Sequence, residues 1–267
     1  MLDEFYKGLV SERGKLRVEP ETRNYIRKEM SYRVLEIIEH IDSFSTTIRK
    51  ANKKNPLVII DGLDKPDLDI AYRVFYNRAT SITQPACKII YTIPIVLLYQ
   101  PEFRSIGHNF HNQFILPNIK IQDKDGKVYE KGYEMLRCAV MKRISSDLIE
   151  DDALNLLISK SGGVMRELTS LVKTACDIAI NDGKNEIDLA SSKKAVNEIK
   201  NDYRRALREE HYQELNMILQ TKEIRKLTFP ELLHNLSVLQ YINDEEWWNI
   251  HPIVLDLLKE EANEIGY

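Results

Sequence analysis

Residues 57–64 read Leu-Val-Ile-Ile-Asp-Gly-Leu-Asp, and this stretch decides the fold class. Leu57–Ile60 is a short run of apolar, mostly β-branched residues, which is typical of a strand buried on both faces of a parallel sheet. Asp61 follows at once, and a carboxylate at the carboxyl end of such a strand lies where α/β sheets bind ligands. We therefore expect a carboxylate site here, although an ordinary Asp-Gly turn after a strand would give the same residues.

Two further apolar stretches predict more strands of the same sheet. Lys88–Thr92 has the composition of a second buried strand, and Phe114–Leu116 that of a third. Asp67–Thr83, between the first two strands, has the pattern of a helix, and residues 21–51 upstream predict one long amphipathic helix. Strand, helix, strand, segment and strand in this order indicate an α/β core with right-handed crossovers.

The pattern becomes all-helical after a polar turn at Asp123–Lys127, which we interpret as a domain boundary. The turn contains Gly126 between charged residues, and no strand-like apolar run follows it for many residues. Helices are predicted at 130–144, 150–160, 164–181 and 188–211.

The last part of the chain combines helices with a hairpin. Apolar residues alternate on both sides of the polar turn Asn243–Glu246, which is a β-hairpin signal. Helices before and after this hairpin favour a winged-helix fold, and the flanking helices are predicted at 212–220, 228–236 and 251–262. The predicted organisation is a helical segment at 1–55, a partial α/β core at 56–125, an all-helical module at 126–211 and a winged-helix module at 212–267.

Composition narrows the classes of function. The chain has 267 residues with 38 basic and 41 acidic side chains, and its net charge of −3 argues against a generic polyanion binder. The longest apolar run, Ile93–Tyr99, is much shorter than the roughly 20 residues of a membrane helix. Three widely spaced cysteines suggest neither a zinc site nor a disulfide framework, and the first residues lack a signal-peptide pattern. We expect a reduced, cytoplasmic and mostly helical protein.

Two more residues strengthen the case for a ligand site. Thr92 ends the second strand, so its hydroxyl would lie beside Asp61 in a parallel sheet; the alternative is an ordinary β-branched strand residue. Arg166 follows Gly162-Gly163 at the start of a helix, from which it could reach a phosphate across a cleft; the alternative is a solvated residue at a helix end.

Through these residues the chain resembles the distal part of an AAA+ or STAND-type P-loop ATPase, closest to the origin-recognition and NACHT-like branches. Leu57–Asp64 is similar to the NACHT form of the Walker B strand, and Lys88–Thr92 resembles the strand that ends in sensor 1. Phe103–Ser105 matches the place of an arginine finger, and Ser161–Arg166 resembles the sensor 2 motif of a helical lid. The similarity covers about residues 55–267.

The resemblance implies a role for each candidate residue in a complete protein that binds ATP and Mg²⁺. Asp61 would hold the metal, and Asp64 would be a catalytic residue that positions the attacking water. Thr92 would sense the terminal phosphate, Arg166 would couple the lid to it, and Arg104 would act on the nucleotide of a neighbouring subunit. Residues 126–211 would be the lid and 212–267 the winged helix that follows it.

The sequence departs from the family pattern in two places. Lys65 stands where the NACHT pattern has Glu, which puts the hydrolytic arrangement in doubt. The phosphate-binding loop, G-x-x-x-x-G-K-[ST], has no match. The nearest candidate, Gly8–Leu16, has one residue too many and Leu16 in place of Ser or Thr. We expect either that the loop lies upstream of Met1 in a longer protein or that the chain is a pseudo-ATPase, and in both cases that it is inactive alone.

The predicted winged helix is acidic. From Asn201 onward the chain has seven basic and thirteen acidic residues, and the predicted wing tip, Asn243–Glu246, contains three carboxylates. Because phosphate contacts dominate DNA affinity, nucleic acid is a disfavoured partner. We expect self-association or a protein partner, and no membrane.

The leading hypothesis is therefore a nucleotide-controlled switch or assembly protein of the AAA+/STAND type. A non-enzymatic adaptor on a degenerate ATPase scaffold, binding a protein through the winged helix, is the first alternative. A DNA-binding regulator is the second.

Overall fold

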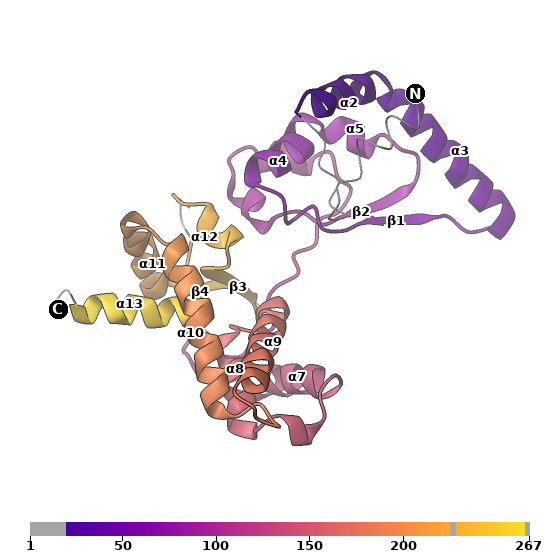
Figure 1. The fold of residues 1–267 in the computed structure, drawn as a ribbon. Helices are drawn as coiled ribbons and strands as arrows, with labels where there is room; N and C mark the ends of the chain where they lie inside the picture. Colours follow the sequence, from indigo (N-terminus) through magenta and orange to yellow (C-terminus); the bar gives the residue numbers. More distant parts are fainter. Residues whose placement is uncertain (1–19, 225–227, 265–267) are drawn as a thin grey trace. The chain divides into compact units, whose positions relative to one another are not determined.

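The structure is a computed structural model that describes residues 20–224 and 228–264 (Figure 1). The chain divides into two compact units. Unit 1 runs to Leu97 and includes Pro101–Gln113, and unit 2 comprises Leu98–Gln100 and the chain from Phe114 onward. The described residues are mostly helical with a small parallel sheet, as predicted, and none of the described helices is long and apolar enough to cross a membrane.

Unit 1 combines short helices with a two-stranded parallel sheet. Both predicted strands are confirmed, and their register runs from Leu57 opposite Lys88 to Ile60 opposite Tyr91. The elements are α2 (Pro20–Tyr32), α3 (Val34–Asn52), β1 (Leu57–Ile60), α4 (Leu68–Tyr72), a π-helical turn (Arg73–Asn77), α5 (Ala79–Thr83), β2 (Lys88–Tyr91), a 3₁₀ turn (Ile95–Tyr99) whose last two residues are assigned to unit 2, and α6 (Phe103–Gly107).

Only one face of this sheet is covered. The core of unit 1 is formed by Ala71, Phe75 and Leu97, against which Tyr91 packs from β2. The prediction of strands buried on both faces is wrong, because Leu57 and Ile59, on the opposite face, are 55% and 63% exposed. In the described chain the sheet has helices against a single face, so the other face remains open to solvent.

Three further predictions for unit 1 and its boundary need correction. Phe114–Leu116 is not a strand: Phe114 and Leu116 are 91% and 94% exposed, and three apolar residues without a neighbouring strand have nothing to pair with. The helix expected at 21–51 is two helices separated at Arg33, where the backbone leaves helical geometry although no Gly or Pro is nearby. The helix expected at 67–83 contains the π-helical turn described above.

Unit 2 begins with an extended stretch and continues with helices. The polar turn at Asp123–Lys127 is present, since the Asp123 N–H donates to the Lys127 carbonyl at 2.7 Å, but it lies inside unit 2. The division between the units falls at Gln113 and Phe114. The finer four-part domain organisation stays a prediction.

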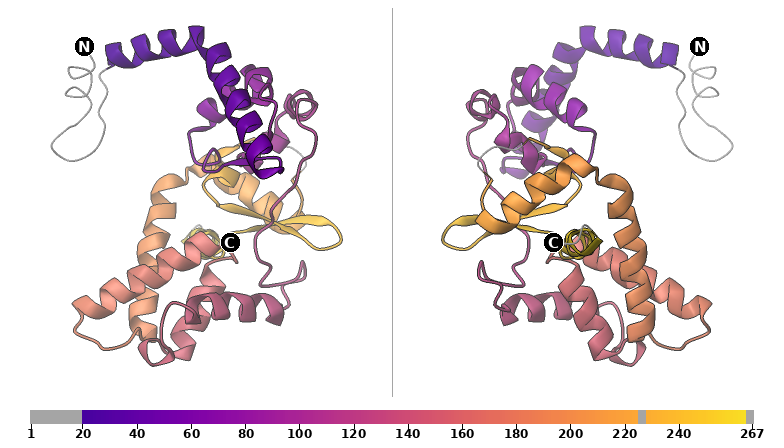
Figure 2. Two further views of the ribbon diagram at one scale, coloured as in Figure 1. Left: turned by 90° about the vertical axis from the view of Figure 1, so that its right-hand side faces the viewer. Right: turned by 90° about the vertical axis from the view of Figure 1, so that its left-hand side faces the viewer.

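The helices and the hairpin expected in unit 2 are present. The helix expected at 188–211 ends at Ala206, however, and of the helix expected at 228–236 only Glu231–His234 is helical. Helices α8, α9 and α10 lie side by side, and the hairpin β3–β4 is antiparallel, with Val238 opposite Ile250 (Figures 1 and 2). The elements are α7 (Glu130–Met141), a 3₁₀ turn (Ser146–Leu148), α8 (Asp151–Lys160), α9 (Met165–Asn181), α10 (Leu189–Ala206), α11 (Glu209–Thr221), α12 (Glu231–His234), β3 (Val238–Ile242), β4 (Glu246–Ile250) and α13 (Pro252–Glu264).

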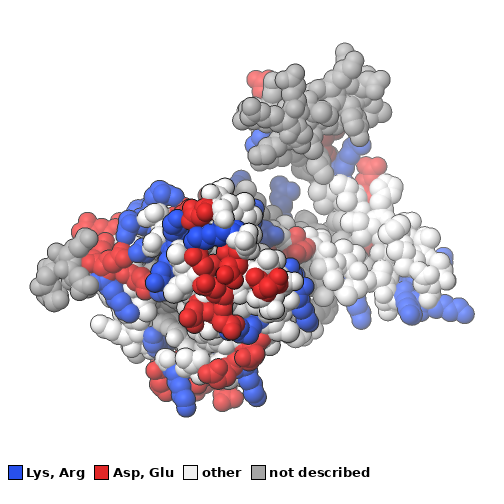
Figure 3. Space-filling view, turned by 60° about the horizontal axis from the view of Figure 1, so that its bottom comes forward, with Lys and Arg blue, Asp and Glu red and all other residues white. Residues whose placement is uncertain are grey.

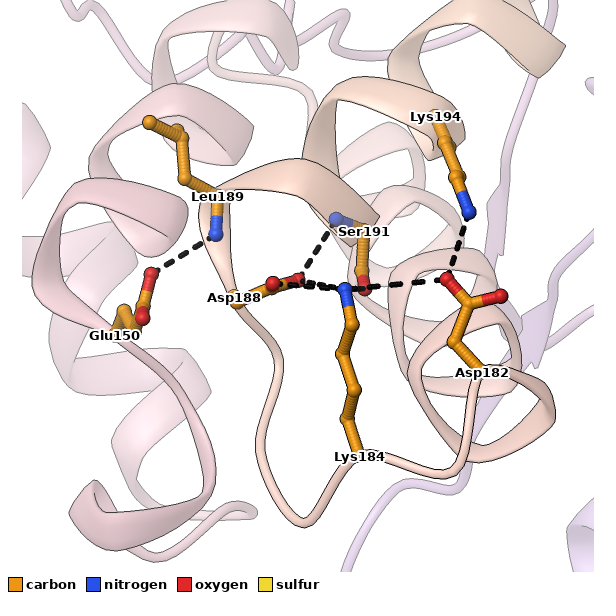
Figure 4. Close-up of polar contacts among 7 residues, drawn as sticks. All are labelled: Glu150, Asp182, Lys184, Asp188, Leu189, Ser191 and Lys194. Carbon is orange, nitrogen blue, oxygen red and sulfur yellow. Dashed lines mark hydrogen bonds and ion pairs between the residues drawn. The ribbon is translucent and has the colours of Figure 1, made fainter.

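The corner between α9 and α10 is closed by ion pairs (Figure 4). Asp188 caps α10 by accepting the Ser191 N–H at 2.9 Å, and the Lys184 ammonium contacts both oxygens of its carboxylate at 2.7 and 2.9 Å. Among the causes that hold the pKa of Asp188 far below its usual range, the hydrogen bond from Lys184 is the largest.

The face of unit 2 that comes forward in Figure 3 shows a cluster of acidic side chains bordered by Lys and Arg.

The turn between α8 and α9 joins the helices of unit 2 to its hairpin. Gly162 and Gly163 have φ angles of 61° and 80°, which side chains other than Gly rarely adopt. The Gly162 carbonyl accepts the Tyr241 hydroxyl of β3 at 2.6 Å, and the Gly163 carbonyl accepts the Ile119 N–H at 3.1 Å. A Cβ on Gly163 would lie 1.7 Å from the Ile119 carbonyl oxygen. We call residues 161–164 the Gly-Gly turn.

The Gly-Gly turn makes unit 2 sensitive to a single methyl group. Gly163→Ala should lower the free energy of unfolding of unit 2 by roughly 3 kcal/mol or more, because the Ile119 backbone must move to admit the Cβ. Gly126→Ala is the matched control: its φ is 83°, but a Cβ there would meet nothing within 4 Å, so strain alone should cost about 1 kcal/mol. Urea unfolding, followed by tryptophan fluorescence, measures the free energy of unfolding of both variants. Equal losses of stability in the two would contradict the close packing of the Gly-Gly turn against Ile119.

Candidate functional site

The carboxyl ends of β1 and β2 bring together three of the predicted site residues. Asp61 directly follows β1 and Thr92 directly follows β2, where its N–H extends the ladder to the Ile60 carbonyl at 3.1 Å. The Thr92 hydroxyl donates to Asp64 Oδ1 at 3.3 Å. Asp61 and Thr92 follow the paired residues Ile60 and Tyr91, and the Thr92 hydroxyl is hydrogen-bonded to the second carboxylate, Asp64.

A tight turn explains why Asp64 reaches this position. Gly62 has a φ of 83°, and the Lys65 N–H donates to the Gly62 carbonyl at 3.4 Å, so the chain turns back immediately after the strand. Asp61 accepts the Gly62 N–H at 2.7 Å and is otherwise exposed. The Lys65 ammonium lies 3.9 Å from the position of a Cβ on Gly62, which places a positive charge along the same turn.

The donor set at this edge is small. Nowhere in residues 20–224 and 228–264 do three His, Cys, Asp or Glu side chains gather closely enough to hold a metal ion by themselves. Mg²⁺ commonly keeps several waters and takes one or two carboxylates together with phosphate oxygens. Asp61 fits the part of such a carboxylate, with Asp64 close by, and the other ligands would be water and the phosphate oxygens of a nucleotide.

Arg104 and Arg166 lie outside this cluster. Arg104 is exposed on α6 of unit 1, and in the described part of the chain no contact joins it to Asp61, Asp64 or Thr92. Arg166 is exposed in the first turn of α9 and therefore belongs to unit 2. The structure thus groups three of the five predicted site residues and leaves the roles of both arginines as predictions.

The surroundings of Arg166 are more ordered than its own exposure suggests. Glu167, the next residue, is partly buried, and burial raises the pKa of its carboxyl while the charge of Arg166 opposes that shift. Tyr203 on α10 is buried nearby, and desolvation raises the pKa of its hydroxyl. The helix that carries Arg166 is therefore held by its buried side to the rest of unit 2.

His251 is a buried polar residue whose environment the sequence did not reveal. The helix predicted at 251–262 begins here, and His251 Nδ1 accepts the Ile253 N–H at 3.3 Å in the first turn of α13. The ring is fully buried and packs on Tyr203 with centroids 5.0 Å apart. Burial lowers the pKa of His251 to about 3, and the Ser161 carbonyl only partly opposes this.

Comparisons with known proteins add little to this geometry. No protein-family model matches the chain, and no curated protein matches it in sequence. Among solved structures, a mutant of RuvB from Thermotoga maritima is similar over 97% of this chain and 96% of that chain, with 13% sequence identity and a TM-score of 0.37. A likeness at this score does not establish a family, so the AAA+ resemblance stays a prediction.

The neutral state of His251 should make unit 2 sensitive to acid. Between about pH 6.5 and pH 3 the imidazole is protonated in the unfolded chain and neutral in the folded chain. As the pH is lowered through this range, the free energy of unfolding should therefore decrease by up to about 1.4 kcal/mol per pH unit. His251→Asn retains a side-chain oxygen for the Ile253 N–H but does not titrate, so it should lose this part of the slope.

Urea unfolding at several values between pH 7 and pH 4.5 tests this expectation. The difference between the wild-type chain and the variant isolates His251 from the carboxylates that titrate in both proteins. His234→Asn, in α12 of the same unit, is the control and should keep the wild-type slope. A His251→Asn variant with an unchanged slope would show that the buried imidazole is not the source.

Proposed function

We propose that this chain carries the magnesium-side and lid parts of a nucleotide-controlled switch of the AAA+/STAND type. The observation that supports the proposal is the Thr92–Asp64 hydrogen bond beside Asp61 at the carboxyl ends of two parallel strands. Ligands bind at this edge in α/β sheets, and two carboxylates there suit magnesium and an activated water. The roles proposed are those of a metal ligand for Asp61 and a water-orienting residue for Asp64.

The remaining roles extend the same proposal. Thr92, which holds Asp64 by its hydroxyl, would respond to a terminal phosphate, and Arg104 would act on the nucleotide of a neighbouring copy. Arg166 would contact phosphate from a lid formed by residues 126–211, and residues 212–267 would be a winged helix. The order of helices, hairpin and closing helix in unit 2 supports this division.

No catalytic step is assigned to the chain by itself. Its sequence contains no G-x-x-x-x-G-K-[ST] loop to cradle phosphates, and Lys65 lies along the turn where the NACHT pattern has an acidic residue. We therefore expect the isolated chain neither to hydrolyse ATP nor to bind it tightly.

A second candidate function is an adaptor that binds a protein through the hairpin. The hairpin tip is exposed and acidic at Asp244, Glu245 and Glu246, which favours a basic protein surface over DNA. Close to this tip, one residue pair before the turn, Tyr241 stacks on Trp247 with ring centroids 4.6 Å apart. A mobility-shift assay at physiological salt would promote the DNA alternative if it showed tight, sequence-dependent binding.

The metal role of Asp61 can be tested without nucleotide turnover. Titration with Mn²⁺ followed by electron paramagnetic resonance should show weak binding, with a dissociation constant on the order of 1 mM, because few ligands come from the protein. Asp61→Ala should abolish this binding. Asp69→Ala, which removes an exposed carboxylate from α4 of the same unit, should leave it unchanged.

Calorimetric titration with Mg-ATP and Mg-ADP completes the test. The expected result is no binding tighter than about 1 mM and no phosphate release. Mn²⁺ binding that survives in Asp61→Ala would remove the basis of the proposed function. Turnover of ATP by this chain would show instead that it builds a phosphate site without the usual loop.

A further inference from the structure

Among residues 20–224 and 228–264, no strand pairs with the second hydrogen-bonding edge of β1. Because the Thr92 N–H donates to the Ile60 carbonyl, the backbone of Ile60 and Val58 faces β2 and that of Leu57 and Ile59 faces the other way. In the part of the chain that the structure describes, β1 pairs with β2 alone. A row of free N–H and C=O groups is a template for pairing with another strand.

The side chains on this edge strand are also apolar and accessible. Leu57 and Ile59, on the open face, are 55% and 63% exposed, and Ile90 on β2 continues that face at 50%. Val58, on the other face, is 37% exposed. Soluble proteins usually protect an edge strand with charged residues or bulges in the strand, or with a helix or loop that covers it. Leu57–Ile60 contains no charged residue and pairs with β2 without a bulge, so the strand is suited to an interface.

The two ends of β1 carry opposite charges. Lys53 and Lys54 immediately precede the strand and are exposed, whereas Asp61, Asp64, Lys65 and Asp67 follow it with a net negative charge. If a second copy of β1 lay antiparallel to the first, the lysines of each copy would lie alongside the aspartates of the other. A parallel arrangement would instead place like charges side by side. The segment 53–64 is therefore self-complementary in the antiparallel direction alone.

We propose that β1 pairs with β1 of a second copy of this chain, antiparallel across a two-fold axis, to form a four-stranded sheet in the order β2-β1-β1-β2. The interface is isologous, so it closes at the dimer and leaves no growing β1 edge. It brings Lys53 and Lys54 of the second copy to the carboxylates of the first. This inference does not rest on the proposed function.

The oligomeric state tests the proposal directly. A pairing of so few residues makes a small interface, so the dissociation constant should lie between about 10 µM and about 1 mM. Sedimentation equilibrium over this range should show a monomer–dimer equilibrium without larger species. Ile59→Lys should raise the dissociation constant at least about tenfold, since it places charges at the centre of the pairing.

Phe44→Lys is the matched control. Phe44 is 69% exposed on α3, so the substitution removes an accessible apolar side chain from the same unit without touching the strand, and it should leave the dimer intact. A chain that stays monomeric over the whole range would overturn the proposal. So would a dimer that Phe44→Lys dissociates and Ile59→Lys does not.

Charge exchange tests the antiparallel direction. One variant carries Lys53→Glu and Lys54→Glu, so that both ends of its strand are acidic; the other carries Asp61→Lys and Asp64→Lys, so that both ends are basic. Each variant alone should be monomeric, and an equimolar mixture should form a heterodimer in which both ends attract. If the mixture does not dimerise, or if either variant alone dimerises as well as the wild-type chain, the antiparallel pairing is wrong.

Discussion

The hydrogen bond from the Tyr241 hydroxyl to the Gly162 carbonyl is the contact on which the architecture of unit 2 depends. It lies within the core, where Tyr241 is 1% exposed, and it links the turn between two helices to a strand far along the chain. Leu239 and Pro252 also approach Gly162, so that helix, strand and the last helix converge at one backbone position. Any side chain larger than hydrogen would separate them, because the space is already filled.

The electrostatic design of the two units differs. In unit 2 many charged groups are paired across short loops or between helices, as Lys200 and Arg204 are with Glu260. Such pairs, at the surface, set the geometry of corners more than they contribute stability. In unit 1 the charges near the sheet lie at the two ends of β1, on the turn after it and at Lys88, the first residue of β2. That arrangement leaves Asp61 and Lys65 accessible to a ligand or to another chain.

Elements with a long, regular pattern could be predicted from the sequence, and contacts made by single residues could not. The helices of unit 2 have apolar faces several turns long, and the two strands are continuous apolar runs, so tertiary context did not override them. The prediction of a strand at Phe114–Leu116 was wrong, because three apolar residues do not indicate whether a partner strand exists. Similarly, the pairing of Thr92 with Asp64 depends on the positive φ of Gly62, and the burial of His251 depends on packing across unit 2.

The separation in sequence between contacting residues has a consequence for the order of folding. The ion pair of Lys184 with Asp188 spans four residues, so closing that corner costs little chain entropy. The Gly162–Tyr241 contact spans 79 residues and becomes available only after the hairpin exists. Since local contacts form faster than distant ones, α9 and α10 should associate early and the hairpin should dock late. During synthesis on the ribosome, the helices would thus emerge and pair before the strand that locks their turn has been translated.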